Sequence, residues 1–286
     1  IPLRLVGSEM CIRDSRTGER VLAVDGTHNP FLLPNLTRPW DVPAAGGSGP
    51  LGIARYVELL RMGSPGDVPI EVLQHPHLAL DLFSIRYALV PDSSSMGAEL
   101  RAQPERWSTV TTWQYDTDDP DSRYTLFRNA SARPRAWCAT RLVRADDGDA
   151  RDAIRTGTLK GGAPFEAATT VLADRDALTE WTDVSTSAPT RITPQPSTLP
   201  SYRVESATPC VLVLSEVFYP WWRATLDGRT VVPARVNHTM VGVAVPAGTH
   251  DIRLSLRPVS LWTGAALSGV SVMGWLFLVV AAIRRP

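Results

Sequence analysis

Residues 210–257 read CVLVLSEVFYPWWRATLDGRTVVPARVNHTMVGVAVPAGTHDIRLSLR, and this stretch decides the fold class of the chain. Residues 210–218 are mostly apolar, which is typical of a buried strand. Asp227-Gly228 separates two short β-prone segments and predicts a type I′ hairpin. From 251 to 257 apolar and polar residues alternate, so we expect one face of that strand to be buried and the other to meet water. The whole pattern predicts the antiparallel sheets of a β-sandwich.

An uncharged segment follows the β pattern almost directly. Residues 259–283 read VSLWTGAALSGVSVMGWLFLVVAAI, 25 residues without a charged side chain. A helix of this length reaches roughly 37 Å, which exceeds the roughly 30 Å hydrocarbon core of a membrane. We therefore expect one C-terminal transmembrane helix, whose small residues allow further helices to pack against it. Arginines flank it on both sides, so the β-rich part before it decides the orientation: 284–286 as a cytoplasmic tail, the rest extracytoplasmic.

The other segments predict a division of the chain into regions. Residues 16–145 contain short strand-like runs and a helical pattern, and predict a mixed α/β extracytoplasmic region. Residues 146–200 are rich in acidic residues, proline, serine and threonine, and predict a loop-rich connection. Residues 201–258 are expected to be β-sandwich-like. Residues 1–15 include VGSEMCIRDS, which resembles a translated sequencing adapter, so we expect an artefact or disorder there. The expected fold class is mainly β with a smaller α/β portion.

Composition excludes some classes of function. The 286 residues carry 29 Lys and Arg against 29 Asp and Glu, so the formal charge is zero. A nucleic-acid-binding protein is expected to show a basic excess, and no nucleic-acid partner is predicted. Three cysteines cannot form a disulfide framework. Cys138 and Cys210 lie on expected strands, and whether they pair stays open at this point.

A family resemblance rests on the run from 216 to 258. Its aromatic strand Tyr219-Pro220-Trp221-Trp222, the Asp227-Gly228 turn, the strand with Asn237 and the segment PAGTH at 246–250 resemble the C-terminal extracytoplasmic region of the YfhO family of bacterial membrane proteins. Trp221 stands where that family usually has glycine. Weaker upstream similarities follow in the same order, so the resemblance extends over roughly residues 19–283.

The resemblance implies a multi-pass protein of the cell membrane, similar to glycosyltransferases that use lipid-linked sugars. In such proteins a membrane bundle carries the catalytic acid and a soluble extracytoplasmic domain helps to bind donor or acceptor. The chain opens without a signal-peptide pattern, so we expect a fragment that lacks the other membrane helices and is inactive alone. The alternative is a non-catalytic, membrane-anchored carbohydrate-binding or scaffolding module. Ten or more membrane spans with an acidic residue in the first outer loop would favour the enzyme.

Five residues form the candidate substrate-binding site. Tyr219, Trp221 and Trp222 crowd the start of one strand, and alternation sends the two tryptophans to opposite faces. An exposed tryptophan can stack on a sugar ring or lie among lipid headgroups. Asn237 and His238 on the next long strand would add directional polar contacts to envelope glycan, lipid-linked sugar or membrane lipid. Burial of either tryptophan in the sandwich core is the competing interpretation.

Two further clusters carry weak signals. Asp116, Asp118, Asp119 and Asp121 offer oxygens for a hard cation, but Pro120 among them suits a solvated turn. His75 and His77 could face the same side of a strand, yet no third ligand accompanies them. No catalytic residue, metal site or cofactor is predicted, and the sequence leaves donor, acceptor, linkage and oligomeric state open.

Overall fold

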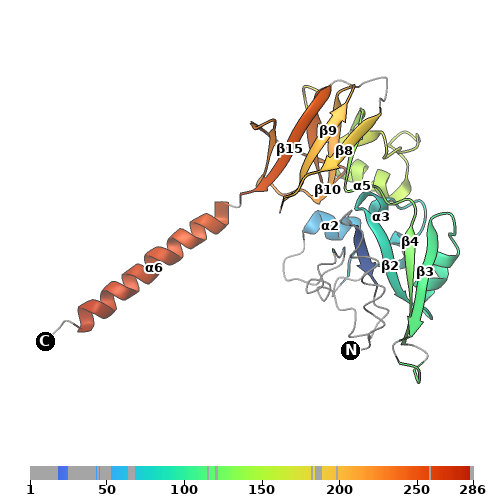
Figure 1. Ribbon diagram of the computed structural model, residues 1–286, viewed down its shortest axis with the longest axis horizontal. Helices are drawn as coiled ribbons and strands as arrows, with labels where there is room; N and C mark the ends of the chain where they lie inside the picture. The colour runs from blue at the N-terminus through green and yellow to red at the C-terminus, as the bar shows by residue number, and fades with distance from the viewer. Residues whose placement is uncertain are drawn as a thin grey trace.

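The computed structural model is built mainly from β-strands, as the sequence predicts, with a long helix at its C-terminal end (Figure 1). It describes residues 19–24, 43, 45, 53–63, 68–114, 116–119, 122–181, 183, 189–197, 199–257 and 259–283. Within 259–283 it describes the side chains of 263–277, 279–280 and 283. The expectations for residues 1–15 and 284–286 lie outside the described residues.

The N-terminal part is the smaller α/β portion that the sequence predicts. Its four-stranded sheet has the order β1-β2-β4-β3, with β1 parallel to β2 and the other neighbours antiparallel. The strands are β1 (Arg20–Ala23), β2 (Ile85–Pro91), β3 (Trp107–Gln114) and β4 (Arg123–Asn129). Short helices accompany them: α2 (Ala54–Leu59), η3 (Ile70–Val72), α3 (Ala79–Leu82) and α4 (Ser95–Arg101).

Two further sheets form the sandwich. The six-stranded sheet has the order β5-β10-β14-β13-β7-β6, and the five-stranded sheet the order β12-β11-β15-β9-β8. Strands of the first are β5 (Ala136–Ala139), β6 (Arg141–Arg144), β7 (Thr170–Ala173), β10 (Cys210–Val217), β13 (Ala234–Val236) and β14 (Met240–Val245). Strands of the second are β8 (Thr190–Pro194), β9 (Ser201–Ser206), β11 (Trp222–Leu226), β12 (Arg229–Val231) and β15 (Gly248–Leu256).

The six-stranded sheet is covered on both faces around β10, which explains why the sequence of that strand is an apolar run. On β10, Leu212 and Leu214 lie in the core shared with the five-stranded sheet. Val211 and Val213 on the opposite face belong to the core shared with the N-terminal part. All four side chains are fully buried. A strand buried on both faces has no polar side, so β10 reads as a continuous apolar segment instead of an alternating one.

The sandwich includes strands from outside residues 201–258, where the sequence predicts it. β5 and β6 come from the expected mixed region, and the expected loop-rich connection contains α5 (Asp147–Thr156), β7 and β8. β6, α5 and β7 make one unit, because β6 and β7 pair in parallel and α5 connects them. Asp146 caps α5 by accepting a hydrogen bond from the backbone N–H of Asp149 (2.8 Å). The four-residue strand β7 was missed because four residues are too few for a clear periodicity.

The β11–β12 hairpin confirms the expected Asp227-Gly228 turn. Both residues have positive φ, 50° and 80°, as a type I′ turn requires. The Asp227 carboxylate accepts from the backbone N–H of Asp251 (2.8 Å) and lies 2.7 Å from His250 Nδ1. The hydrogen bond with Asp227 raises the pKa of His250, and the same bond lowers the pKa of Asp227.

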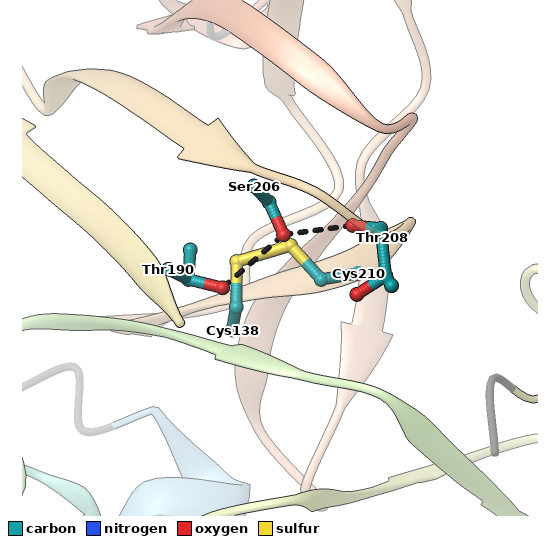
Figure 2. Close-up of a disulfide and its surroundings, with 5 residues drawn as sticks. All are labelled: Cys138, Thr190, Ser206, Thr208 and Cys210. Atoms are coloured by element: carbon teal, nitrogen blue, oxygen red, sulfur yellow. Dashed lines mark hydrogen bonds between the residues drawn. A yellow bond between two sulfur atoms is a disulfide. The ribbon is translucent and has the colours of Figure 1, made fainter. Parts of the chain in front are cut away.

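A disulfide answers the question that the sequence left open. Figure 2 shows Cys138 of β5 joined to Cys210 of β10, with Cα atoms 5.5 Å apart. In the antiparallel register Cys138 lies opposite Leu212, so Cys210 is its diagonal neighbour on the same face. The bridge closes a sequence separation of 72 residues within the six-stranded sheet.

The C-terminal helix α6 (Val259–Ile283) extends away from the sandwich (Figure 1). Among the described residues, no helix is both long and apolar enough to cross a membrane. The described part of the chain therefore does not by itself support the membrane span that the sequence predicts at 259–283.

We expect the disulfide to carry a large share of the stability of the sandwich. Closing a loop of about this length stabilises a protein by about 4 kcal/mol, because it restricts the unfolded chain. Reductant should therefore lower the thermal unfolding midpoint of the wild type by roughly ten degrees. The double variant Cys138→Ala/Cys210→Ala should unfold at the reduced midpoint with or without reductant. If the thermal unfolding midpoint of the wild type is the same with and without reductant, the bridge is contradicted.

The His250–Asp227 pair should make stability depend on pH within a defined window. Because the folded pKa of His250 is raised, its contribution is complete below about pH 6.5 and is lost as pH rises through the folded value. The lowered pKa of Asp227 makes its contribution complete above about pH 4 and lost as pH falls through the folded value. Melting curves of wild type and His250→Asn should thus differ most between about pH 4 and 6.5 and converge in alkaline buffer. Asp227→Asn should reproduce this profile, and a constant difference at every pH would refute it.

Candidate functional site

Tyr219 and Trp221 lie in the turn that connects β10 to β11. The backbone N–H of Trp222 donates to Tyr219 O (3.0 Å), which closes the turn around Pro220. The ring centroids of Tyr219 and Trp221 are 5.1 Å apart with an interplanar angle of 71°, the edge-to-face arrangement that aromatic pairs favour. Tyr219 is 40% exposed and Trp221 is half-buried. The two rings form one aromatic pair at the end of the sandwich.

Trp222 has a different environment from its neighbour. It is half-buried and packs against the core between the two sandwich sheets. Its indole N–H donates to Val217 O (3.0 Å), so its polar group is satisfied inside the fold. Strand alternation accounts for the difference, because Trp221 and Trp222 point to opposite faces of the five-stranded sheet. Trp222 therefore packs in the core, whereas Trp221 pairs with Tyr219 outside it.

Asn237 lies in the β13–β14 turn and forms two hydrogen bonds with Leu172 of β7. Its backbone N–H donates to Leu172 O (2.7 Å), and its side-chain oxygen accepts from the Leu172 N–H (2.9 Å). The side-chain carbonyl thus takes the place of a backbone carbonyl in the hydrogen bonding of β7. Asn237 and His238 both have positive φ, 46° and 68°, a conformation that asparagine tolerates better than most residues. Asn237 is 0% exposed, and its role here is structural.

His238 is also buried, with 3% of its surface exposed. Among the described residues neither ring nitrogen has a hydrogen-bond partner, and Nε2 is 3.7 Å from Glu58 Oε2 of α2. Burial lowers the pKa of His238, so the neutral imidazole is favoured. The pKa of Glu58 is lowered by the hydrogen bond from Arg151. His238 therefore lies between the six-stranded sheet and α2, away from solvent.

The five candidate residues do not form one surface. Tyr219 and Trp221 make the aromatic pair, Trp222 turns into the sandwich, and Asn237 and His238 point into the interior toward β7 and α2. The expectation that polar Asn237 and His238 face the aromatics is therefore corrected. Alternation could separate the tryptophans, but the pairing of Asn237 with a residue 65 positions away left no signal in the sequence.

Strand pairing places the aromatic pair at the junction with α6. The backbone N–H of Arg257 donates to Trp221 O (3.1 Å), which extends the β11–β15 ladder by one residue. Arg257 precedes the first residue of α6 by only two positions. The alternation at 251–257 already predicted that Arg253 and Arg257 face outward. Their position beside Trp221 was missed, because it follows from the register of β11 against β15.

The weaker clusters show local structure instead of a site. The backbone N–H of Asp118 donates to the Asp116 carboxylate (3.0 Å), as in an Asx turn; Asp121 lies outside the described residues. His77 is 6% exposed, and burial lowers its pKa to about 4. In the part of the chain that the structure describes, no three His, Cys, Asp or Glu side chains are placed to hold a metal ion.

No protein-family model, curated protein or solved structure matches this chain. The aromatic pair is therefore interpreted from its own geometry.

The two tryptophans should respond differently to truncation. Trp222→Ala removes a side chain that packs in the sandwich core and should cost roughly 3 kcal/mol of unfolding free energy. Trp221→Ala removes a half-buried ring that pairs edge-to-face with Tyr219 and should cost about 1 kcal/mol or less. Urea unfolding of both variants and the wild type measures the difference. Equal losses would show that Trp221 is also a core residue and would remove it from the candidate site.

Proposed function

We propose that this chain is the extracytoplasmic, membrane-anchored part of a glycosyltransferase-like protein of the cell envelope. In this proposal the sandwich binds envelope glycan or lipid-linked sugar beside the membrane, and the chemistry belongs to a membrane bundle outside the chain. The resemblance to the YfhO family supports the class of protein. The position of the aromatic pair supports the binding role.

One observation carries the proposal: the hydrogen bond from Arg257 N–H to Trp221 O. It sets Trp221, with its partner Tyr219, beside Arg257, which precedes the first residue of α6 by two positions. Aromatic rings with a polar atom suit both sugar stacking and the boundary between lipid and water. A sugar carried on a membrane lipid offers a ring for stacking and lies at the boundary between lipid and water. The aromatic pair is therefore located where such a substrate would be presented if α6 enters a membrane.

The character of α6 supports anchoring. The helix has 25 residues and no charged side chain. Large apolar side chains are exposed along its described part: Leu267, Val270, Val272, Met273, Trp275, Leu276, Phe277, Val280 and Ile283. Exposing this much apolar surface to water is unfavourable, so the helix requires an apolar environment. A membrane, with further helices packed against the small residues of α6, supplies that environment.

The disulfide supports the compartment. Disulfides persist in oxidising compartments and are rare where thioredoxin and glutathione keep thiols reduced. The Cys138–Cys210 bridge therefore favours the outer side of the cell membrane for the sandwich.

A second candidate is a non-catalytic carbohydrate-binding or scaffolding module on the same anchor. The burial of Asn237 and His238 favours it, because the sequence-predicted site then retains an aromatic pair without its polar partners at the surface. Both candidates use Tyr219 and Trp221 for binding. They differ in whether a catalytic membrane bundle belongs to the same protein.

Binding of a lipid-linked sugar tests the proposed role. The full chain in neutral detergent should bind undecaprenyl-phosphate-linked hexose, and Trp221→Ala should weaken binding about tenfold through loss of stacking. Fluorescence titration measures the dissociation constants. Trp113→Ala is the matched control, because Trp113 is also half-buried and stacks on a tyrosine, Tyr124, in the N-terminal sheet. Unchanged binding in Trp221→Ala, or an equal loss in the control, would contradict the proposal.

A further inference from the structure

The outer face of the five-stranded sheet changes in charge along its length. Residues 223, 253, 255 and 257 share this face, because Arg223 lies opposite Ser255 and strand side chains alternate. Trp221 is opposite Arg257 on the same face, since the Arg257 N–H to Trp221 O bond continues that register. We call Trp221, Arg223, Arg253 and Arg257 the junction patch. Figure 1 shows that the chain enters α6 from the C-terminal end of β15, the strand that carries Arg253 and ends just before Arg257.

Other arginines on this side of the five-stranded sheet lie opposite acidic residues. Arg203 holds Asp251 with two hydrogen bonds, from Nε to Oδ1 (2.9 Å) and from Nη2 to Oδ2 (3.1 Å). Arg191 lies opposite Glu205 in the β8–β9 register. The carboxylate nearest to the junction patch along β15 is that of Asp251, and it is already engaged by Arg203. The far end of the face is therefore close to neutral.

The three arginines of the junction patch keep their charge available. All three are exposed, and no ion pair to a carboxylate is formed by them among the described residues. Arg223 Nη1 donates to Pro220 O (3.1 Å) and Trp222 O (2.9 Å). These bonds hold the guanidinium against the turn that carries Trp221. Arg257 thus lies opposite Trp221, Arg223 follows Trp221 on the same face, and Arg253 is the diagonal neighbour of Arg223 on β15.

We propose that the junction patch docks on the anionic phospholipid headgroups of the leaflet that α6 enters. Guanidinium groups bind phosphate through paired N–H donors, and tryptophan favours the headgroup region. The docking surface is continuous with the apolar helix, because Arg257 lies two residues from its first residue. This inference rests on the proposed membrane anchor and adds to it a lipid partner and the residues that bind it. Docking fixes the orientation of the sandwich on the membrane and brings Tyr219 and Trp221 to the headgroup level.

Lipid titration of the full chain in neutral detergent tests the inference. Phosphatidylglycerol and phosphatidylcholine of equal chain length are added separately, and native mass spectrometry measures the dissociation constant of each. Phosphatidylglycerol should bind at least tenfold more tightly than phosphatidylcholine. Replacing Arg223, Arg253 and Arg257 together by glutamine should weaken phosphatidylglycerol binding on the order of 100-fold, since each arginine near an anionic surface contributes about 1 kcal/mol. High salt should weaken wild-type binding in the same direction.

The matched control removes the same number of exposed arginines from other places. Arg175, Arg191 and Arg229 are exposed and lie outside the junction patch, so their triple glutamine variant should bind phosphatidylglycerol as the wild type does. Equal affinity for the two lipids, or equal losses in the two triple variants, would overturn the inference. Melting curves of both variants establish that they remain folded.

Failure of the inference can be distinguished from failure of the proposed anchor. Membranes from cells that express each variant are washed with alkaline carbonate, which extracts proteins that do not cross the bilayer. Release of the wild type would refute the anchor and the lipid docking together. Retention of the wild type and of both triple variants, combined with equal affinity for the two lipids, would refute the docking alone.

Discussion

The burial of β10 on both of its faces is the constraint on which the rest of the structure depends. One face supplies Leu212 and Leu214 to the core between the sandwich sheets, and the other supplies Val211 and Val213 to the core shared with the N-terminal part. A strand in this position needs a covering layer on each side. The five-stranded sheet is one such layer, and the N-terminal α/β portion with α5 is the other. The two parts of the chain are therefore joined through a common core.

Polar contacts reinforce this junction at the end of β10. Arg20 of β1 donates from Nη1 to Phe83 O (2.9 Å) and Ser215 O (2.5 Å), and its Nη2 lies 3.3 Å from Glu216 Oε2. Glu216 also pairs with Arg135, just before β5. Burial lowers the pKa of Arg20, and its closest partners are carbonyls and a carboxylate that satisfy the guanidinium. These contacts connect β1 of the N-terminal sheet with β10 of the sandwich.

The same sheet organisation divides the candidate site residues between two environments. Residues at the outer edge, Tyr219 and Trp221, meet solvent beside the start of α6, where the arginines of the junction patch gather. Residues in the β13–β14 turn, Asn237 and His238, are enclosed, because the six-stranded sheet is covered by α2 and α5 on that side. Surface chemistry is thus concentrated at one end of the five-stranded sheet, and the polar turn of the six-stranded sheet maintains the fold.

The sequence by itself determined the local features that depend on neighbours along the chain. It predicted the mainly β fold, strands at 210–218 and 251–257 where the structure has 210–217 and 248–256, the Asp227-Gly228 hairpin and the opposite directions of Trp221 and Trp222, because strand alternation and turn chemistry are short-range effects. Only the tertiary structure decided which segments pair. It brought β5 and β7 into the sandwich, joined Cys138 to Cys210, enclosed Asn237 against Leu172 and set Trp221 beside Arg257. These outcomes follow from strand register and from burial between layers, which bring together residues 36 to 72 positions apart through contacts that no local pattern encodes.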